Sequence, residues 1–285
     1  MRRTTVSLSA GALVLAVVAT GCGGSGKPAA TKSSSGSASA SASASPAAAG
    51  SLGAKVSAVR DRVEKAGTGS FTLSDATIAG KALSTIDGRY SLDDETLDAA
   101  VSIPDGTGKS ATAKIRVLGD TAYIQAAEWK PPSNTCWLKT TPAGISSDYG
   151  LDVSSADVPL PLLLLGKFQP QTSSGEGVYQ GELDLASATL LLSGTTKSQV
   201  EQAKPKGTVP AFVTDDGTTA TVTVPGYAMA TALSTALKVD DSQFTAMKSE
   251  RYEATLGPAK DTSAIAAPEA GKQMSKDDLT ANRCG

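Results

Sequence analysis

Hydrophobic residues after position 51 recur first with the period of a helix and then with the period of a strand. Ser51 is a suitable N-cap and Gly67 a suitable end, so the pattern predicts a helix over residues 51–66. The apolar positions are spaced by four, three and four: Leu52, Val56, Val59 and Val63. We expect this face of the helix to be buried and the charged face opposite to meet water.

From residue 71 onward, runs in which apolar and polar residues alternate are typical of half-buried β-strands. The inward positions of these runs are Phe71 and Leu73; Ile86, Tyr90 and Leu92; Leu97, Ala99, Val101 and Ile103; Ala113, Ile115 and Val117; Ala122, Ile124 and Ala126; Val209, Ala211 and Val213; and Ala220, Val222 and Val224. Gly119-Asp120 predicts a hairpin turn, and Asp215-Asp216-Gly217 predicts another. The pattern indicates antiparallel meanders, each with one buried face.

Helical segments interrupt these strands. Residues 160–168 follow Pro159, include Pro161, and contain four consecutive leucines, so a helix here would be apolar on all sides. Such a helix must be buried, either as a core helix packed on the sheet or as the lining or lid of an apolar cavity. Asp184 predicts the cap of a second helical stretch, and residues 196–203 predict a third that is short and polar.

The N-terminal segment has the features of an export signal. Arg2 and Arg3 precede an apolar run at residues 6–18, which is too short for a comfortable membrane-spanning helix. The string Ala19-Thr20-Gly21-Cys22 resembles a bacterial lipobox. We expect a lipoprotein signal peptide over residues 1–21 and lipid attachment at Cys22; the alternative is a plain secreted protein with an unrelated cysteine. The Gly-, Ser- and Ala-rich residues 22–50 predict a flexible tether that reaches roughly 30 Å.

Composition argues against catalysis. The 285 residues include no histidine, which excludes Ser-His-Asp and Cys-His mechanisms, and with three cysteines an ordinary mixed Cys and His zinc site is excluded as well. The formal net charge of −2 is not that of a strongly basic nucleic-acid binder. We therefore expect a protein that is not an enzyme and that uses no cofactor, no metal and no nucleic-acid partner.

The cysteine count fits an oxidising compartment. If Cys22 is acylated, Cys136 and Cys284 remain as an even pair outside the cytoplasm, where disulfides persist. We predict that these two residues are bridged, which would hold the C-terminal tail to the segment after Pro131-Pro132. The alternative is two free thiols.

Four stretches resemble, in order and spacing, motifs of the LppX/LprAFG lipoproteins. They are residues 115–124 followed by Cys136-Trp137-Leu138-Lys139, residues 178–186, residues 209–217, and residues 252–268 as a closing strand that ends in a proline. The resemblance implies a LolA-like half-barrel over residues 51–270, followed by a C-terminal tail at residues 271–285. The fold class would be α+β, with a strongly curved antiparallel β-sheet and helices packed on its concave face.

The resemblance also implies that the protein binds or transfers a lipid or acylated glycolipid in an apolar cavity. It would work at the extracytoplasmic face of the cell membrane, held there by its N-terminal lipid anchor. The residues expected to line the cavity are Leu160, Leu162, Leu163, Leu164, Leu165, Phe168, Val101, Ile115, Val117 and Ile124. The alternative is a non-catalytic surface lipoprotein, a sensor or accessory module with a filled cavity that acts through contacts with a partner protein.

Overall fold

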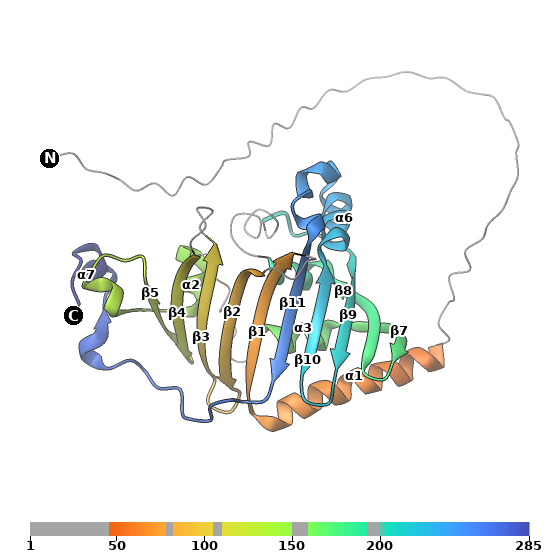
Figure 1. Cartoon of the computed structure of the whole chain (residues 1–285), viewed down its shortest axis with the longest axis horizontal. Coiled ribbons are helices and arrows are strands. Elements are labelled where there is room, and N and C mark those ends of the chain that lie inside the picture. Colours follow the sequence, from red (N-terminus) through yellow and green to blue (C-terminus); the bar gives the residue numbers. More distant parts are fainter. Residues whose placement is uncertain are drawn as a thin grey trace, which may run out of the picture. The chain divides into compact units, whose positions relative to one another are not determined.

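One twelve-stranded sheet forms the framework of the computed structural model, which describes residues 46–77, 82–104, 110–149, 159–192, 200 and 202–284 (Figure 1). The strand order is β12-β6-β5-β4-β3-β2-β1-β11-β10-β9-β8-β7. The strands are β1 (Thr68–Thr77), β2 (Ala82–Ser91), β3 (Thr96–Pro104), β4 (Ser110–Leu118), β5 (Thr121–Ala126), β6 (Trp137–Thr140), β7 (Gln169–Gly175), β8 (Val178–Asp184), β9 (Thr208–Asp215), β10 (Ala220–Pro225), β11 (Glu250–Gly257) and β12 (Gln273–Met274). The predicted curved sheet is confirmed, and it is antiparallel apart from the β12–β6 pair, which is parallel.

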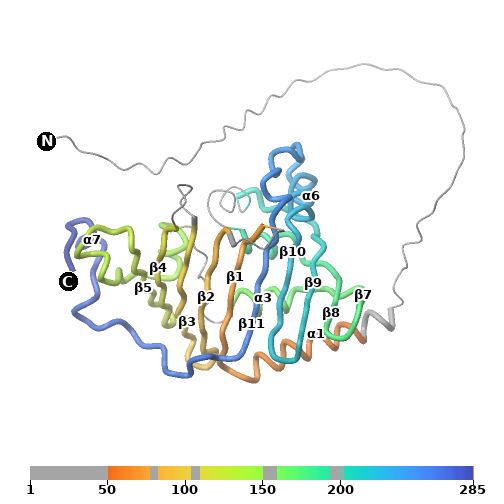
Figure 2. The backbone as a smooth tube through the Cα atoms, viewed as in Figure 1, coloured from red at the N-terminus to blue at the C-terminus, as the bar shows by residue number. Residues whose placement is uncertain are grey.

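The chain builds this sheet in two parts that meet near its centre (Figure 2). Strands β1 to β6 follow one another in order, and β7 to β10 form a second meander. Strand β11 pairs with β10 on one side and with β1 on the other, and so joins the parts. Both predicted hairpins are present, because Gly119-Asp120 connects β4 to β5 and residues 216–219 connect β9 to β10.

Helices cover the inner, concave face of the sheet. The described α-helices are α1 (Pro46–Ala66), α2 (Pro142–Tyr149), α3 (Leu160–Lys167), α4 (Leu185–Ala188), α6 (Gly226–Leu237) and α7 (Lys276–Thr280). The described 3₁₀ helices are η1 (Ser133–Thr135), η2 (Thr189–Leu191), η3 (Asp241–Phe244), η4 (Met247–Ser249) and η5 (Ala270–Lys272). Helix α3 packs against β1, β8, β10 and β11, and α1 runs beside α3 toward β7. These contacts place the leucine-rich helix over the second half of the sheet.

The first helix is longer than the sequence pattern predicts. It begins at Pro46, not at Ser51, so it includes residues that the composition assigns to the tether. The physical reason is that proline suits the first turn of a helix and that the three alanines after it have the highest helix propensity. At its other end, Arg62 forms an ion pair with Asp215 of the β9–β10 hairpin, with Nη2 and Oδ1 2.6 Å apart.

The C-terminal region also differs from expectation. The closing strand predicted over residues 252–268 runs from Glu250 to Gly257, and residues 258–268 form no strand. The expected tail at residues 271–285 contains η5, β12 and α7. Strand β12 extends the sheet by pairing Gln273 with Trp137 and Met274 with Leu138 of β6. The segment is thus part of the fold, and its short strand depends on β6 for its pairing.

Candidate functional site

The strand register arranges the inner face of β1 to β6 in rows that cross the sheet. One row is fully covered, and its members are Phe71, Gly88, Ala99, Ile115, Ile124 and Leu138. Its apolar side chains are at most 5% exposed, so this part of the face is closed core. Phe71 also lies against Tyr90, with ring centroids 6.5 Å apart, and burial raises the pKa of Tyr90 to about 12.

The next row toward the other end of the strands is covered less completely. It consists of Leu73, Ile86, Val101, Ala113 and Ala126, and Ile103 lies two residues beyond Val101 on β3, in the row after it. Val101 and Ala126 are buried, whereas Leu73, Ile86, Ile103 and Ala113 are only partly buried although they pack against the core. We call Leu73, Ile86, Ile103 and Ala113 the inner apolar strip. Partly exposed aliphatic side chains near one another on a concave face are suited to contact an apolar ligand.

The ten predicted lining residues fall into two groups. Those on α3 and after it lie over β1, β8, β10 and β11, whereas the strand residues lie on β3, β4 and β5. Eight of the ten are buried in one continuous core: Leu162, Leu164, Leu165, Phe168, Val101, Ile115, Val117 and Ile124. Leu160 and Leu163 are partly exposed. The structure therefore gathers eight of the ten in one core, and Leu160 and Leu163 are the most accessible leucines of α3.

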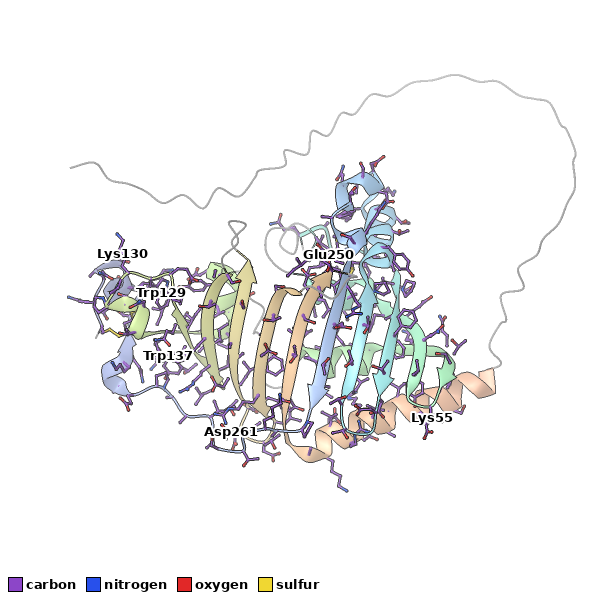
Figure 3. The ribbon with its side chains drawn as sticks, viewed as in Figure 1. Lys55, Trp129, Lys130, Trp137, Glu250 and Asp261 are labelled. Carbon is purple, nitrogen blue, oxygen red and sulfur yellow. A yellow bond between two sulfur atoms is a disulfide. The ribbon has the colours of Figure 1, made fainter. Side chains whose placement is uncertain are left out.

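The inner face ends in a polar rim made by Asp75, Glu250 and Tyr252. Asp75 lies directly opposite Tyr252 in the β1–β11 pair, and the Tyr252 hydroxyl donates a hydrogen bond of 2.6 Å to Glu250 Oε2. Figure 3 shows Glu250 at the upper end of the sheet. Oδ1 of Asp75 is buried and has no hydrogen-bond partner. Burial and the nearby charge of Glu250 raise the pKa of Asp75 to about 6.

Sequence analysis missed this rim, although a signal for it exists. Asp75 follows Phe71 and Leu73 at the same spacing of two, so it continues the inward positions of β1. A carboxylate in phase with buried residues marks a place where the inner face becomes polar. The pKa of Tyr252 is also raised, first by burial and then by the hydrogen bond to Glu250. The rim therefore combines a phenol and two carboxyl groups at one end of the inner apolar strip.

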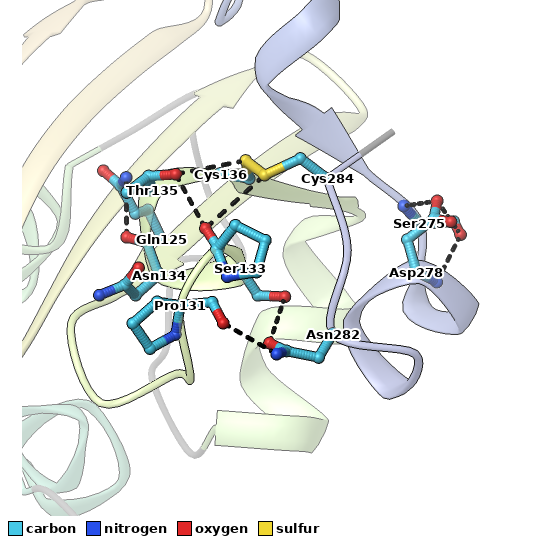
Figure 4. Close-up of a disulfide and its surroundings, with 11 residues drawn as sticks. Gln125, Pro131, Ser133, Asn134, Thr135, Cys136, Ser275, Asp278, Asn282 and Cys284 are labelled. Atoms are coloured by element: carbon cyan, nitrogen blue, oxygen red, sulfur yellow. Dashed lines mark hydrogen bonds between the residues drawn. A yellow bond between two sulfur atoms is a disulfide. The ribbon is translucent and has the colours of Figure 1, made fainter.

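Cys136 and Cys284 form the predicted disulfide (Figure 4). Their Cα atoms are 6.0 Å apart, and the Cys136 side chain is fully buried. Asn282 Nδ2 donates a hydrogen bond of 2.8 Å to the Pro131 carbonyl, which holds the same two segments together. The Cys136–Cys284 disulfide thus ties the end of the C-terminal segment to the connection between β5 and β6.

Some of the predicted features lie outside the residues that the structure describes. Cys22, the signal peptide and residues 22–45 of the tether are outside the described part of the chain, as are residues 196–199 and 201 of the third predicted helical stretch. No helix among residues 46–284 that the structure describes combines the length and hydropathy needed to cross a membrane. Within the same residues, no three Cys, Asp or Glu side chains gather as a metal site would require.

A curved, unclosed sheet with an apolar inner strip and a polar rim defines a half-barrel domain. No protein-family model and no curated protein sequence matches the chain. Among solved structures, it is similar to LprF from Mycobacterium bovis, at 13% identity and a TM-score of 0.41, over 80% of this chain and 98% of that one. It is also similar to the lipoprotein LppX from Mycobacterium tuberculosis, at 14% identity and a TM-score of 0.38, over 76% of this chain and 98% of that one.

Both structures are of the LppX/LprF type, which is the group that the sequence motifs resemble. At these scores the likeness is one of general architecture. The function of this chain must therefore be inferred from its own contacts, burial and charges.

Proposed function

We propose that this protein is a membrane-anchored extracytoplasmic lipoprotein that binds or transfers a lipid or glycolipid on the concave face of its sheet. The observation that carries the proposal is the inner apolar strip of Leu73, Ile86, Ile103 and Ala113, which stays partly exposed beside the closed row that begins at Phe71. Each methylene of an acyl chain that leaves water for such a surface contributes about 0.8 kcal/mol. Several methylenes along the strip are enough for useful affinity.

The polar rim supports an amphipathic ligand in a defined orientation. An acyl chain on the strip would leave its headgroup near Asp75, Glu250 and Tyr252, whose oxygen atoms can accept or donate hydrogen bonds. Because Asp75 Oδ1 has no partner, a headgroup hydroxyl that donates to it would satisfy a buried acceptor. This arrangement needs no chemical step, which agrees with a sequence that lacks histidine.

Anchoring follows from the N-terminal sequence. Cleavage before Cys22 and acylation of its thiol and amino group would supply two or three acyl chains, and more than one is needed for stable attachment. Between this anchor and Pro46 the tether would then have the residues 23–45, since α1 takes up the rest. The domain would stay within a few tens of ångströms of the bilayer and could still reorient.

Uptake of a fluorescent fatty acid by the chain 23–285 tests the proposal. The compact unit Ala44–Gly285 contains the whole described core, so this chain keeps the folded domain. We expect Ile86→Asp to reduce uptake at least tenfold, because it places a charge on the inner apolar strip. Leu163→Asp, on the accessible side of α3, tests whether the helix borders the same ligand.

Thr85→Asp is the matched control, because Thr85 is the neighbour of Ile86 on β2 and points to the opposite face of the sheet. It introduces the same charge and should leave uptake unchanged. Near-ultraviolet circular dichroism checks that each variant is folded. Equal uptake by Ile86→Asp and Thr85→Asp would show that the inner strip is not the site. No uptake by the parent chain would favour a filled half-barrel that acts through protein contacts.

A further inference from the structure

The outer face of β1 to β5 carries polar rows in the same register as the apolar rows inside. The central row is Thr72, Asp87, Ala100, Lys114 and Gln125, and rows with Arg89, Asp98 and Arg116 on one side and with Thr85, Ser102 and Thr112 on the other flank it. Ala100 is the one small side chain in the central row. Its neighbours therefore rise above it and leave a hollow at the middle of the face.

Two adjoining grooves occupy this hollow. One has a volume of about 440 Å³ and extends from Ser70 of β1 to Arg116 of β4. The other has about 340 Å³ and extends from Thr85 of β2 to Gln125 of β5 and Asn134. Both are lined by Asp87, Ala100 and Lys114, so they form one outer trough across β1 to β5. With strands about 4.8 Å apart, the trough is roughly 20 Å long.

Residues 258–268, which we call the C-terminal strap, form a wall of the outer trough. Figure 2 shows the strap leaving the lower end of β11 and running along the sheet toward β12. Arg89 Nη1 donates hydrogen bonds of 2.8 Å to Asp261 Oδ2 and to the Ser263 carbonyl, and Arg116 Nη1 donates one of 3.0 Å to the Ala266 carbonyl. The Cys136–Cys284 disulfide holds the chain beyond the strap. The wall is thus fixed at several points.

The charges in the outer trough nearly balance. Asp98 forms ion pairs with Arg89 and Arg116, at 3.5 and 3.2 Å, and Asp261 forms another with Arg89. Lys114 and Lys260 make no hydrogen bond or ion pair with the described residues, and Asp87 accepts one hydrogen bond of 2.8 Å, from Thr72. An anion would meet three carboxylates here and a cation would meet four basic groups. A neutral ligand that both donates and accepts hydrogen bonds meets no such repulsion.

From this geometry we infer that the outer trough binds a neutral oligosaccharide. Vicinal hydroxyl groups are donors and acceptors at once, and Asp87 and Lys114, on either side of Ala100, offer an acceptor and a donor that can contact them together. A peptide could not bind here as an added strand, because the backbone groups of β1 to β5 are engaged in the sheet. The sheet separates this ligand from a lipid on the inner face, so the inference does not depend on the proposed function.

Backbone amide chemical shifts of the chain 23–285 test this inference. We would titrate maltohexaose, cellohexaose and chitohexaose, each up to about 10 mM, which covers millimolar dissociation constants. We expect at least one saccharide to shift the amides of residues 87, 100 and 114. Ala100→Trp should weaken this binding at least tenfold because it fills the middle of the trough, and Lys114→Ala should weaken it several-fold.

Thr214→Trp is the matched control, because Thr214 is an exposed outward residue of β9, outside the trough. It adds the same bulk and should leave saccharide binding unchanged. Inositol hexakisphosphate, spermine and a Gly-Ser decapeptide serve as an anion, a cation and a peptide. The inference is overturned if no saccharide binds, if the shifts lie elsewhere or survive Ala100→Trp, or if one of these three probes binds the trough more tightly than every saccharide.

Discussion

Asp75 shows how one side chain can change the polarity of a sheet face. It continues the inward positions of β1, where the preceding inward residues are apolar, and it lies beside Tyr252 and Glu250. Its position was open to prediction, because the period of two in β1 fixes which residues point inward. The environment of Asp75 could not be predicted, because Tyr252 and Glu250 are distant in sequence and reach Asp75 only through the pairing of β1 with β11.

Replacing Asp75 by Asn should change how stability depends on pH. The folded protein raises the pKa of Asp75 from 3.8 to about 6, so the neutral carboxyl group is favoured in the fold. Its contribution to stability is therefore full below about pH 4 and is lost as the pH rises through about 6. Because the side chain is only half-buried, we expect a loss of about 1–2 kcal/mol for the parent chain.

Urea unfolding at pH 4 and at pH 7.5 measures this difference. Relative to the parent chain, Asp75→Asn should reduce the fall in the free energy of unfolding between the two pH values. Asp87→Asn, which removes a carboxylate from the outer face of β2, serves as a control for the loss of one charge. An identical fall in the parent and in Asp75→Asn would show that the polar rim does not hold a neutral carboxyl group.

At the scale of elements, the strands were easier to predict than the helices. Alternation identified the core strands β1 to β5 and β9 to β10, and Asp184 caps α4 as expected by accepting a hydrogen bond from the Ser187 amide. Strand β7 was missed because its residues are almost all polar and exposed, so it has no inward pattern. Helix α6 was missed because it follows β10 directly and no side-chain cap marks where it begins. Strand β12 exists only through its pairing with β6.

The candidate site was also predicted only in part from the sequence. The strand residues of the predicted lining are inward, as their alternation indicates, and three of the five leucines of α3 are buried, namely Leu162, Leu164 and Leu165. The sequence could not show where α3 lies on the sheet. Its position over β1, β8, β10 and β11 leaves Ile86 and Ile103 partly exposed, although they looked like ordinary core positions.

The C-terminal elements should depend on the disulfide. Cys136 and Cys284 are 148 positions apart, so the bond closes a long loop in the unfolded chain. We expect the double substitution Cys136→Ala and Cys284→Ala to lower the free energy of unfolding by about 2–4 kcal/mol. Urea unfolding measures the loss, and hydrogen exchange should show that β12 and α7 lose protection first. Unchanged protection in β12 would mean that its pairing with β6 is sufficient without the covalent bond.

At the scale of the whole molecule, one sheet separates two different surfaces. Its concave side carries the core, the inner apolar strip and the polar rim, whereas its other side carries the outer trough and the C-terminal strap. The single-residue alternation of a β-strand produces this separation, because neighbouring residues such as Thr85 and Ile86 point to opposite faces. A lipid on one face and a saccharide on the other would then be bound without contact between them.

Native mass spectrometry of the chain 23–285, expressed in bacteria and purified without detergent, tests the central claim most directly. The account predicts a complex heavier than the polypeptide by the mass of one lipid, and solvent extraction should release that lipid. The Ile86→Asp variant should carry less of it, and Thr85→Asp should carry as much as the parent. Only the bare polypeptide mass in repeated preparations, together with no uptake of a fluorescent fatty acid, would contradict the claim that this half-barrel binds lipid.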